Sequence, residues 1–341
     1  MSDKSKPLRV GIDLGTSRSS ISTSDGQRHV VDSYVGWPVD MVARKVLKRE
    51  VLVGREALDN RSMLELARPL EEGLIKEGST RDEAAVRELL RHLLALAGVE
   101  PGGNGRVDAV VGVPAEALRV NKQSLRRALE GLVGGLMIVS EPFAVAYGME
   151  ALLHTMIIDI GAGTADFCVM KGRLPTEEDQ RTLTLAGDWL DEQVALKIRE
   201  RYPEAAFSIH MVRAWKERHS FVGEPRARVM VRVPVNGKPT EIDITEPLGA
   251  ACESLLPPVI ETMVDLLTRV EPEYQERVRN HIILAGGTAL IGGLDKRLER
   301  ELADIGGGKV KVVKDPIYCG SDGGLAIALD APDSDWEKLS A

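Results

Sequence analysis

One pattern occurs twice in this chain: an apolar strand ends in an aspartate and runs into a glycine-rich turn. The first copy is LRVGIDLGTSRSS, with Asp13, and the second is TMIIDIGAGTADFCV, with Asp159. A single turn of this kind is a weak signal, because any buried strand followed by a tight turn looks similar. Two copies, roughly a domain's length apart, predict a nucleotide held between two related halves.

Each turn carries groups that suit a phosphate. Glycines allow backbone N–H groups to approach an anion closely, and the hydroxyl groups of Thr16, Ser17 and Thr164 lie beside them in the sequence. A carboxylate beside a phosphate is repelled unless a divalent cation lies between the two. Asp13 and Asp159 therefore predict Mg²⁺, held largely through its own water molecules.

The composition is that of a globular protein with an acidic surface. The 341 residues are 43% hydrophobic, which is enough for the cores of two domains. A net charge of -8 argues against a nucleic-acid-binding surface. The N-terminus is polar and no run approaches ~20 apolar residues, so we expect neither a signal peptide nor a membrane span. Three widely spaced cysteines are typical of reduced core residues and of a cytoplasmic protein.

The hydrophobic pattern alternates between strands and helices. Strands are expected at both glycine-rich turns, and helices at 81–97, 115–132, 188–201, 255–270 and 291–303. Two segments interrupt this alternation. Residues 34–68 are short and mixed, and residues 189–260 include a hairpin with an Asn236-Gly237 turn. The sequence predicts an α/β fold of two similar halves, each with a mixed sheet and a phosphate loop, plus two inserted subdomains.

Together these motifs resemble the superfamily of actin, sugar kinases and heat-shock chaperone ATPases. Within it they are most similar to the bacterial actins, the MamK group first and the MreB group next. The resemblance implies an actin-like fold with ATP or ADP and Mg²⁺ in a cleft between the halves. It also implies subdomain boundaries: 1–33 and 69–143 for the first core subdomain, closed by 322–341; 34–68 for a small insertion; 144–188 and 261–321 for the second core subdomain; and 189–260 for a larger insertion.

The resemblance assigns both turns to the phosphates of the nucleotide. The matching positions are Asp13, Gly15, Thr16 and Ser17 in the first turn, and Gly161, Ala162, Gly163 and Thr164 in the second. Ala162 stands where many relatives have glycine. Gly187-Asp188 matches a turn near the ribose and the phosphates.

The segment SEPFAVAYG resembles the link between the halves of bacterial actins. Ser140 could cap the following helix, and Glu141 could be a first-turn carboxylate favoured by the helix dipole. The resemblance implies instead that Glu141 orients or deprotonates the water that attacks the terminal phosphorus. Glu141 is thus the first-choice catalytic residue, with Asp159 beside it in the catalytic set.

Two further segments resemble the adenosine-binding part of the family. In ILAGGTALIGGL the matching positions are Gly286, Gly287, Thr288 and Leu290. A buried strand followed by a capped helix would show a similar pattern. In MVRAWKERHSFVG the positions that would reach the base and ribose are Arg213, Lys216 and Glu217, on one helix face. A solvated ion-pair face is the competing explanation.

The implied function is an ATPase that assembles with itself into cytoplasmic cytoskeletal filaments and hydrolyses ATP slowly. A small-molecule kinase of the same superfamily is the alternative, although no acidic base for an acceptor stands in a strong motif. A chaperone would need a further domain after Leu329, and the tail PDSDWEKLSA is too polar for the membrane helix of an FtsA-type actin. The N-terminus and the loop VEPGGNGR are also polar, so no direct membrane anchor is expected. Cargo or adaptor proteins are expected but not identified.

Overall fold

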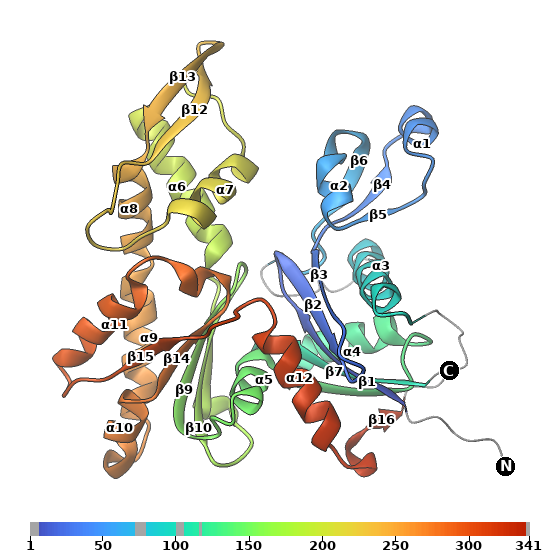
Figure 1. Cartoon of the computed structure of the whole chain (residues 1–341), viewed down its shortest axis with the longest axis vertical. Helices are drawn as coiled ribbons and strands as arrows, with labels where there is room; N and C mark the ends of the chain where they lie inside the picture. The colour runs from blue at the N-terminus through green and yellow to red at the C-terminus, as the bar shows by residue number, and fades with distance from the viewer. Residues whose placement is uncertain (1–6, 72–79, 100–105, 116–117, 339–341) are drawn as a thin grey trace. The chain divides into compact units, whose positions relative to one another are not determined.

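The computed structural model describes residues 7–71, 80–99, 106–115 and 118–338 (Figure 1). The chain divides into two compact units. The first unit is Met1–Leu152 with Asp315–Ala341, and the second is Leu153–Lys314. Most of the VEPGGNGR loop and the ends of the chain lie outside the described residues. The finer subdivision into four subdomains stays a prediction.

The first unit is built on a six-stranded sheet with the order β16-β8-β7-β1-β2-β3. Strands β1, β2 and β3 form an antiparallel meander, whereas β7 and β8 run parallel to β1. The carboxyl ends of β1, β7 and β8 therefore meet at one edge of the sheet. The bounds are β1 (Leu8–Leu14), β2 (Arg18–Thr23), β3 (Arg28–Asp32), β7 (Val107–Val113), β8 (Gly135–Ser140) and β16 (Glu337–Lys338).

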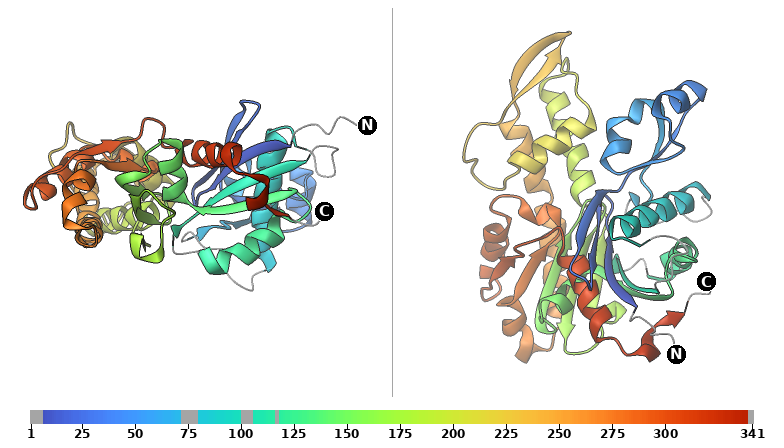
Figure 2. Two further views of the ribbon diagram at one scale, coloured as in Figure 1. Left: turned by 90° about the horizontal axis from the view of Figure 1, so that it is seen from below. Right: turned by 45° about the vertical axis from the view of Figure 1, so that its right-hand side comes forward.

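Four helices cover the two faces of this sheet: α3 (Thr80–Leu96), α4 (Leu118–Leu129), α5 (Glu141–Gly148) and α12 (Cys319–Asp330). Because helices cover both faces, successive side chains of β7 enter different cores on opposite sides of the sheet. Its Ala109 and Val111 join the core beneath α3 and α4, whereas Val110 packs with α5 and α12. Helices α4 and α12 are seen on opposite sides of the sheet in Figure 2. Gly323 of α12 lies so close to the Ala144 carbonyl of α5 that no side chain fits between them.

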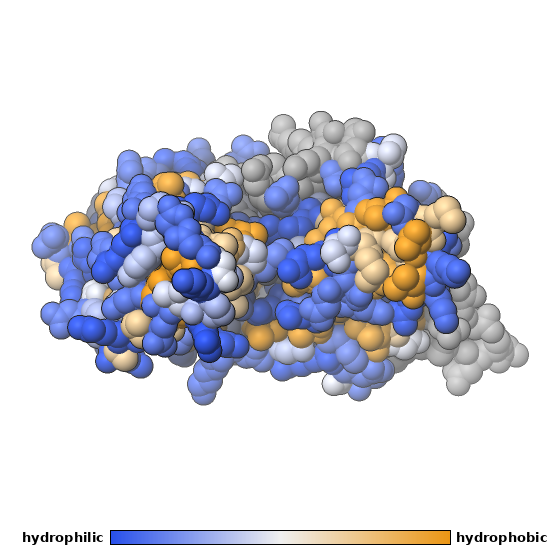
Figure 3. Space-filling view, turned by 90° about the horizontal axis from the view of Figure 1, so that it is seen from above, coloured by the Kyte–Doolittle hydropathy of each residue, from blue (hydrophilic) through white to orange (hydrophobic). Residues whose placement is uncertain are grey.

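Residues 35–67 form a separate small sheet with the order β5-β4-β6. Asp40 caps the helix of this segment by accepting hydrogen bonds from the N–H groups of Val42 and Ala43. The outer side of that helix is apolar and exposed, and Figure 3 shows an apolar area on this part of the surface. The bounds are β4 (Val35–Pro38), α1 (Met41–Leu47), β5 (Leu52–Val53), α2 (Arg55–Asp59) and β6 (Leu64–Ala67).

The second unit repeats the sheet of the first, with the order β11-β10-β9-β14-β15. An antiparallel meander is again followed by two parallel strands. Strands β9, β10, β11, β14 and β15 thus correspond to β1, β2, β3, β7 and β8. The bounds are β9 (Leu153–Ile160), β10 (Ala165–Lys171), β11 (Gln180–Leu183), β14 (Ile282–Ala285) and β15 (Val310–Val312). The predicted α/β fold of two similar halves with mixed sheets is confirmed.

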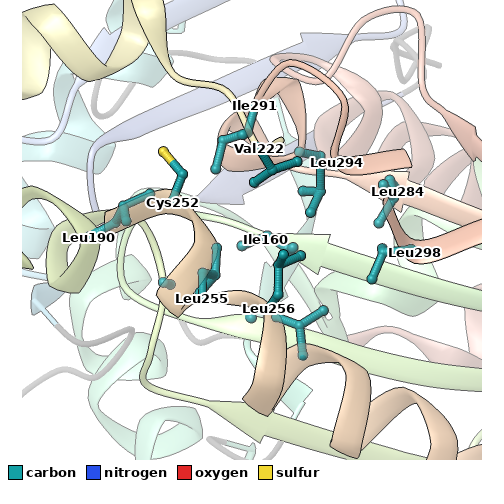
Figure 4. Close-up of a cluster of buried hydrophobic side chains, with 14 of the residues drawn as sticks. Ile160, Leu190, Val222, Cys252, Leu255, Leu256, Leu284, Ile291, Leu294 and Leu298 are labelled. Carbon is teal, nitrogen blue, oxygen red and sulfur yellow. The ribbon is translucent and has the colours of Figure 1, made fainter. Parts of the chain in front are cut away.

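The helices of the second unit share one large core, part of which Figure 4 shows around Ile160, Leu190 and Leu284. The hairpin β12 (Met230–Val235) and β13 (Lys238–Asp243) turns at Asn236 and Gly237, whose positive φ angles of 50° and 77° fit the predicted two-residue turn. The helices are α6 (Gly187–Arg201), α7 (Ile209–His219), α8 (Thr245–Ser254), α9 (Leu256–Thr268), α10 (Pro272–Arg279) and α11 (Leu294–Ala303). Helices α8 and α10 were not expected from the sequence. In the part of the chain that the structure describes, no helix has both the length and the apolar character to cross a membrane.

Candidate functional site

The first glycine-rich turn joins β1 to β2, and hydroxyl groups hold its backbone. The Gly15 carbonyl accepts a hydrogen bond from Ser33 Oγ at 2.6 Å and a longer one from Ser19 Oγ at 3.4 Å. The two serines are fully buried, and their hydroxyl oxygens lie 2.9 Å apart. Neutral donors from β2 and the end of β3 therefore fix the direction of this carbonyl.

The hydroxyl group of Thr16 has a partner within the first unit. Its Oγ1 donates to the Leu70 carbonyl at 2.6 Å, and the residue is buried. The carbonyl of the next residue, Ser17, accepts the N–H of Ser33 at 2.9 Å. The turn is thus held by hydrogen bonds at three successive residues. Because the Thr16 hydroxyl already donates to Leu70, the backbone N–H of Thr16 is the more suitable donor to a phosphate.

Asp13 is the penultimate residue of β1 and lies opposite Gly112 of β7 in the parallel register. A methyl group on Gly112 would come within 3.4 Å of Glu141 Cγ, so the Glu141 side chain lies over this glycine. A methyl group on Gly320, in the first turn of α12, would lie 2.5 Å from Asp13 Oδ2. The structure therefore brings Asp13 and Glu141 to one edge of the sheet. Burial raises the pKa of the Asp13 carboxyl to about 6, and a neighbouring cation would favour its charged form.

Glu141 is the first residue of α5 and is partly exposed. Ser140 occupies the N-cap position, but its side chain accepts no capping hydrogen bond, and Pro142 lies in the first turn. The interpretation of Ser140 as a side-chain cap is therefore not supported. The catalytic role of Glu141 stays a prediction.

The second glycine-rich turn joins β9 to β10 and is closed by a hydrogen bond from the Gly161 N–H to the Thr164 carbonyl at 2.9 Å. Opposite Asp159 on the partner strand lies Asp166, a buried residue whose Oδ1 accepts the Thr182 hydroxyl at 2.6 Å. Like charges directly opposite each other are unfavourable in a sheet. Asp166 was not singled out from the sequence, although a carboxylate inside the apolar run ADFCVM was a usable signal.

The predicted adenosine motif lies directly beside Asp159. Gly286 has a φ of 79°, and a Cβ there would lie 2.4 Å from both Asp159 Oδ1 and the Ile160 carbonyl oxygen. Only glycine fits this position. Gly287, by contrast, has open space around its Cβ position, and Leu290 is 60% exposed. Gly163 and Thr164 complete the turn that Gly286 approaches.

Helix α6 begins against the same turn. The Gly187 N–H donates to the Gly161 carbonyl at 3.1 Å, and the Asp188 N–H donates to the Ala162 carbonyl at 2.7 Å. Thr288 Oγ1 also donates to the Gly161 carbonyl, at 2.7 Å. Three segments that the sequence analysis assigned separately to the nucleotide, 161–164, 187–188 and 286–288, are therefore in contact within the second unit.

Arg213 and Lys216 of α7 face α6. Arg213 forms ion pairs with Asp188 at 2.6 Å and with Asp191 at 2.9 Å, and Lys216 forms one with Asp191 at 2.7 Å. The cluster is mostly buried, so it is not the solvated ion-pair face considered above. Asp191 is fully buried and was missed in the sequence analysis. The signal was the matched spacing: Asp191 follows Asp188 by three positions, and Lys216 follows Arg213 by three positions. Glu217, the third predicted residue, is exposed.

These residues fit the ATP and Mg²⁺ that the sequence implied. Each turn presents one strand-ending aspartate, and each has a carbonyl fixed by internal donors, which leaves neighbouring N–H groups for an anion. Among the described residues, no group of three or more His, Cys, Asp or Glu side chains is placed to hold a metal. One or two carboxylates with water and phosphate oxygens are the usual ligands of Mg²⁺.

The paired sheets and the two turns define an actin-like protein. The family model described as MreB/Mbl protein matches residues 7–334, so the chain belongs to the MreB/Mbl family. It is 42% identical over 332 residues to the actin-like protein MamK of Paramagnetospirillum magneticum, which covers 97% of this chain and 95% of that protein. The Bacillus subtilis cell shape-determining protein Mbl is 25% identical over 355 residues, covering 95% of this chain and 96% of that protein. The predicted resemblance to MamK before MreB is confirmed.

Solved structures agree with this assignment. A MamK double helical filament superposes with a TM-score of 0.92 at 42% identity, covering 96% of this chain and all of that one. A non-polymerising MamK mutant bound to AMPPNP gives a TM-score of 0.73 at 42% identity, covering 95% of this chain and 99% of that one. The predicted actin-like fold is therefore confirmed.

Proposed function

We propose that this chain binds ATP or ADP with Mg²⁺, assembles with itself into cytoplasmic cytoskeletal filaments and hydrolyses ATP slowly. The observation that carries the proposal is the pair of glycine-rich turns, each with a strand-ending aspartate and a carbonyl fixed by internal donors. The likeness to MamK structures solved as a filament and with AMPPNP, over nearly the full chain, supports the same function.

The chain's own groups have distinct parts in this proposal. The backbone N–H groups of the two turns bind phosphate oxygens, and Glu141 orients the attacking water and accepts its proton. Mg²⁺, when bound, neutralises phosphate charge beside Asp13 and Asp159. Gly286, Gly287, Thr288 and Leu290 bind the adenosine, Arg213, Lys216 and Glu217 reach its base and ribose, and Gly187 and Asp188 lie near the ribose and the phosphates.

Self-association needs apolar surface, and α1 supplies some of it. Met41, Val42 and Val46 are 83%, 62% and 60% exposed, an arrangement that leaves three large apolar side chains on a helix of seven residues. Clusters of this kind on a surface are typical of interfaces between proteins. We assign the apolar side of α1 to the contact between copies of this chain.

The test is sedimentation with negative-stain electron microscopy in Mg-ATP, in Mg-ADP and without nucleotide, with phosphate release followed in parallel. We expect filaments and slow phosphate release in Mg-ATP. A monomer that consumes ATP only in the presence of a small acceptor, such as a sugar or acetate, would contradict the proposal and identify a kinase.

The same assay tests the α1 surface. We expect the double variant Met41→Asp, Val42→Asp to bind nucleotide like the unmodified protein but to stay in the supernatant. Leu174→Asp is the matched control, because Leu174 is an equally exposed apolar residue on a loop of the second unit, 72% exposed. Filaments of normal yield from the α1 variant would remove this helix from the interface.

A further inference from the structure

The buried aspartate Asp191 has no part in the function proposed above, yet it is the centre of the ion cluster in the second unit. It is fully buried in α6, and both of its carboxylate oxygens face cations of α7: Arg213 Nε lies 2.9 Å away and Lys216 Nζ 2.7 Å away. With Asp188 the cluster contains two carboxylates and two cations. Its charges balance before any ligand binds, so the cluster does not attract a phosphate by net charge.

The cluster is connected to the second glycine-rich turn through the start of α6. Lys216 Nζ donates to the Gly187 carbonyl at 2.5 Å, which ties α7 to the first residue of α6. The N–H groups of Gly187 and Asp188 donate in turn to the carbonyls of Gly161 and Ala162. Ala186, at the N-cap position, offers no side-chain cap. The turn therefore caps α6 with its own carbonyl groups.

This capping determines where the turn's N–H groups point. The carbonyl of one residue and the N–H of the next belong to the same planar trans peptide and point in opposite directions. Because the Gly161 and Ala162 carbonyls point at α6, the N–H groups of Ala162 and Gly163 point away from it. Those two N–H groups are the donors that a phosphate would need. The position of the first turn of α6 thus sets the direction of two phosphate-binding groups.

We propose that Asp191 is a positioning residue for nucleotide binding: by pairing with Arg213 and Lys216 it fixes α7 to α6, and so holds the second glycine-rich turn with two N–H groups directed at the phosphates. The inference rests on the proposed binding of ATP or ADP. A turn that is already in its binding conformation loses less entropy when the ligand binds. Without the cluster, the turn is correctly oriented for only a fraction of the time, and the apparent Kd rises by the inverse of that fraction.

The experiment measures the affinities of the full-length variant Asp191→Asn for ADP and for adenosine, both by competition with a fluorescent ADP analogue. The substitution keeps the shape of the side chain and removes its charge. If the turn is correctly oriented for a tenth of the time, the Kd for ADP rises about tenfold. The Kd for adenosine, which has no phosphate, is expected to rise much less than that for ADP, because the variant retains Arg213 and Lys216, the residues proposed to reach the base and ribose. The neighbouring Glu192→Gln is the matched control, because Glu192 is an exposed acid on the same helix.

Each other outcome bears on the inference or on the proposed function. Equal losses for ADP and adenosine would show a general loosening of the second unit and overturn the inference, as would unchanged affinity for both. If Asp191→Asn does not fold, Asp191→Glu decides, because it keeps the charge and only displaces the carboxylate from Arg213 and Lys216; a loss confined to ADP supports the proposal and an equal loss overturns it. Failure of the unmodified protein to bind ADP would instead refute the proposed function.

Discussion

The two glycine-rich turns share a sequence pattern but are supported in different ways. In the first unit the Gly15 carbonyl is held by two serine hydroxyls, the farther of which is 18 residues away in the sequence. In the second unit the Gly161 carbonyl is held by Thr288, 127 residues away, and by the start of α6, which an ion cluster anchors. The same local task, fixing a carbonyl so that the next N–H is directed at an anion, is therefore performed by nearby hydroxyl groups in one unit and, in the other, by distant neutral groups whose helix an ion cluster anchors.

The largest expected effect is on phosphate release, and it comes from a variant in the first unit. Glu141→Ala should slow phosphate release by about 10²–10⁴-fold, because it removes the group that orients the attacking water. Filament assembly in Mg-ATP should persist, since both turns are intact. Phosphate release and sedimentation measured on the same samples would check this. Equal loss of both activities would indicate that Glu141 is a structural residue.

A smaller effect is expected where the adenosine motif approaches the second turn. Gly286→Ala places a methyl group 2.4 Å from the Ile160 carbonyl oxygen at a φ of 79°, so the backbone has to move. We expect a loss of about 3 kcal/mol in the free energy of unfolding, measured with urea. Gly287→Ala, with open space around its Cβ, is the control and should cost less than ~1 kcal/mol. Similar losses for both variants would contradict the described contact.

The hydrogen bonds that hold the Gly15 and Gly161 carbonyls can be compared directly by removing one hydroxyl group from each. Ser33→Ala takes away the 2.6 Å hydrogen bond and leaves the Gly15 carbonyl with only the 3.4 Å contact from Ser19. Thr288→Val keeps the side-chain shape and leaves the Gly161 carbonyl with the N–H of Gly187. We expect urea unfolding to show losses of about 1–2 and about 1 kcal/mol respectively. A larger loss for Thr288→Val would mean that α6 does not support the turn.

The smallest expected effect is the pH dependence of stability that a buried ion pair gives to the second unit. Asp179 is buried beside Arg173 and Lys171, at 2.7 and 3.1 Å, and it accepts the N–H of Thr176 at 2.8 Å. Burial alone would raise the pKa of its carboxyl, but the hydrogen bonds of Thr176 and the neighbouring cations outweigh burial and lower it to about 2.

Because the pKa is lower in the folded state than its ordinary value of 3.8, the stabilisation is present above that value and is lost as the pH falls from about 4 towards 2. We expect Asp179→Asn to lower the free energy of unfolding by only about 1 kcal/mol at pH 7, because half-exposed Arg173 is screened by solvent. The loss should become progressively smaller at lower pH. The loss caused by Ser33→Ala should not change over this range. Urea unfolding at several pH values would reveal whether the two losses behave differently.

Local sequence patterns predicted most of the strands and helices. Features that depend on contacts between residues far apart in the sequence could not be predicted. The strands that contain Asp13 and Asp159 are short apolar runs followed by glycine, so their type was predictable and their ends lie one residue beyond the aspartates. The partner of a hydroxyl is not a local property: nothing near Thr16 indicates that its Oγ1 donates to Leu70. Helix α8 was missed because it contains Pro247 and Gly249 and follows a strong hairpin signal.

In the candidate site, too, contiguous motifs were predictable and the side-chain contacts between distant helices were not. The glycines and aspartates of the two turns are contiguous in the sequence, and the second turn contacts Gly187 and Thr288 as the separate assignments suggested. Asp191 was missed because its meaning depends on the pairing of α6 with α7. A carboxylate three residues after Asp188 is unremarkable in a helix until two cations are known to face it.

Helix α12 has a consequence for the order in which the protein is made. It covers one face of the first unit, where its Gly323 meets Ala144 without an intervening side chain, yet it is encoded after the whole of the second unit. During synthesis the second unit can fold while Val110 and Ala144 of the first still lack their cover. The earliest part of the chain to leave the ribosome is thus among the last to be completed, and a nascent chain that lacks its final turns exposes apolar surface for chaperones to bind.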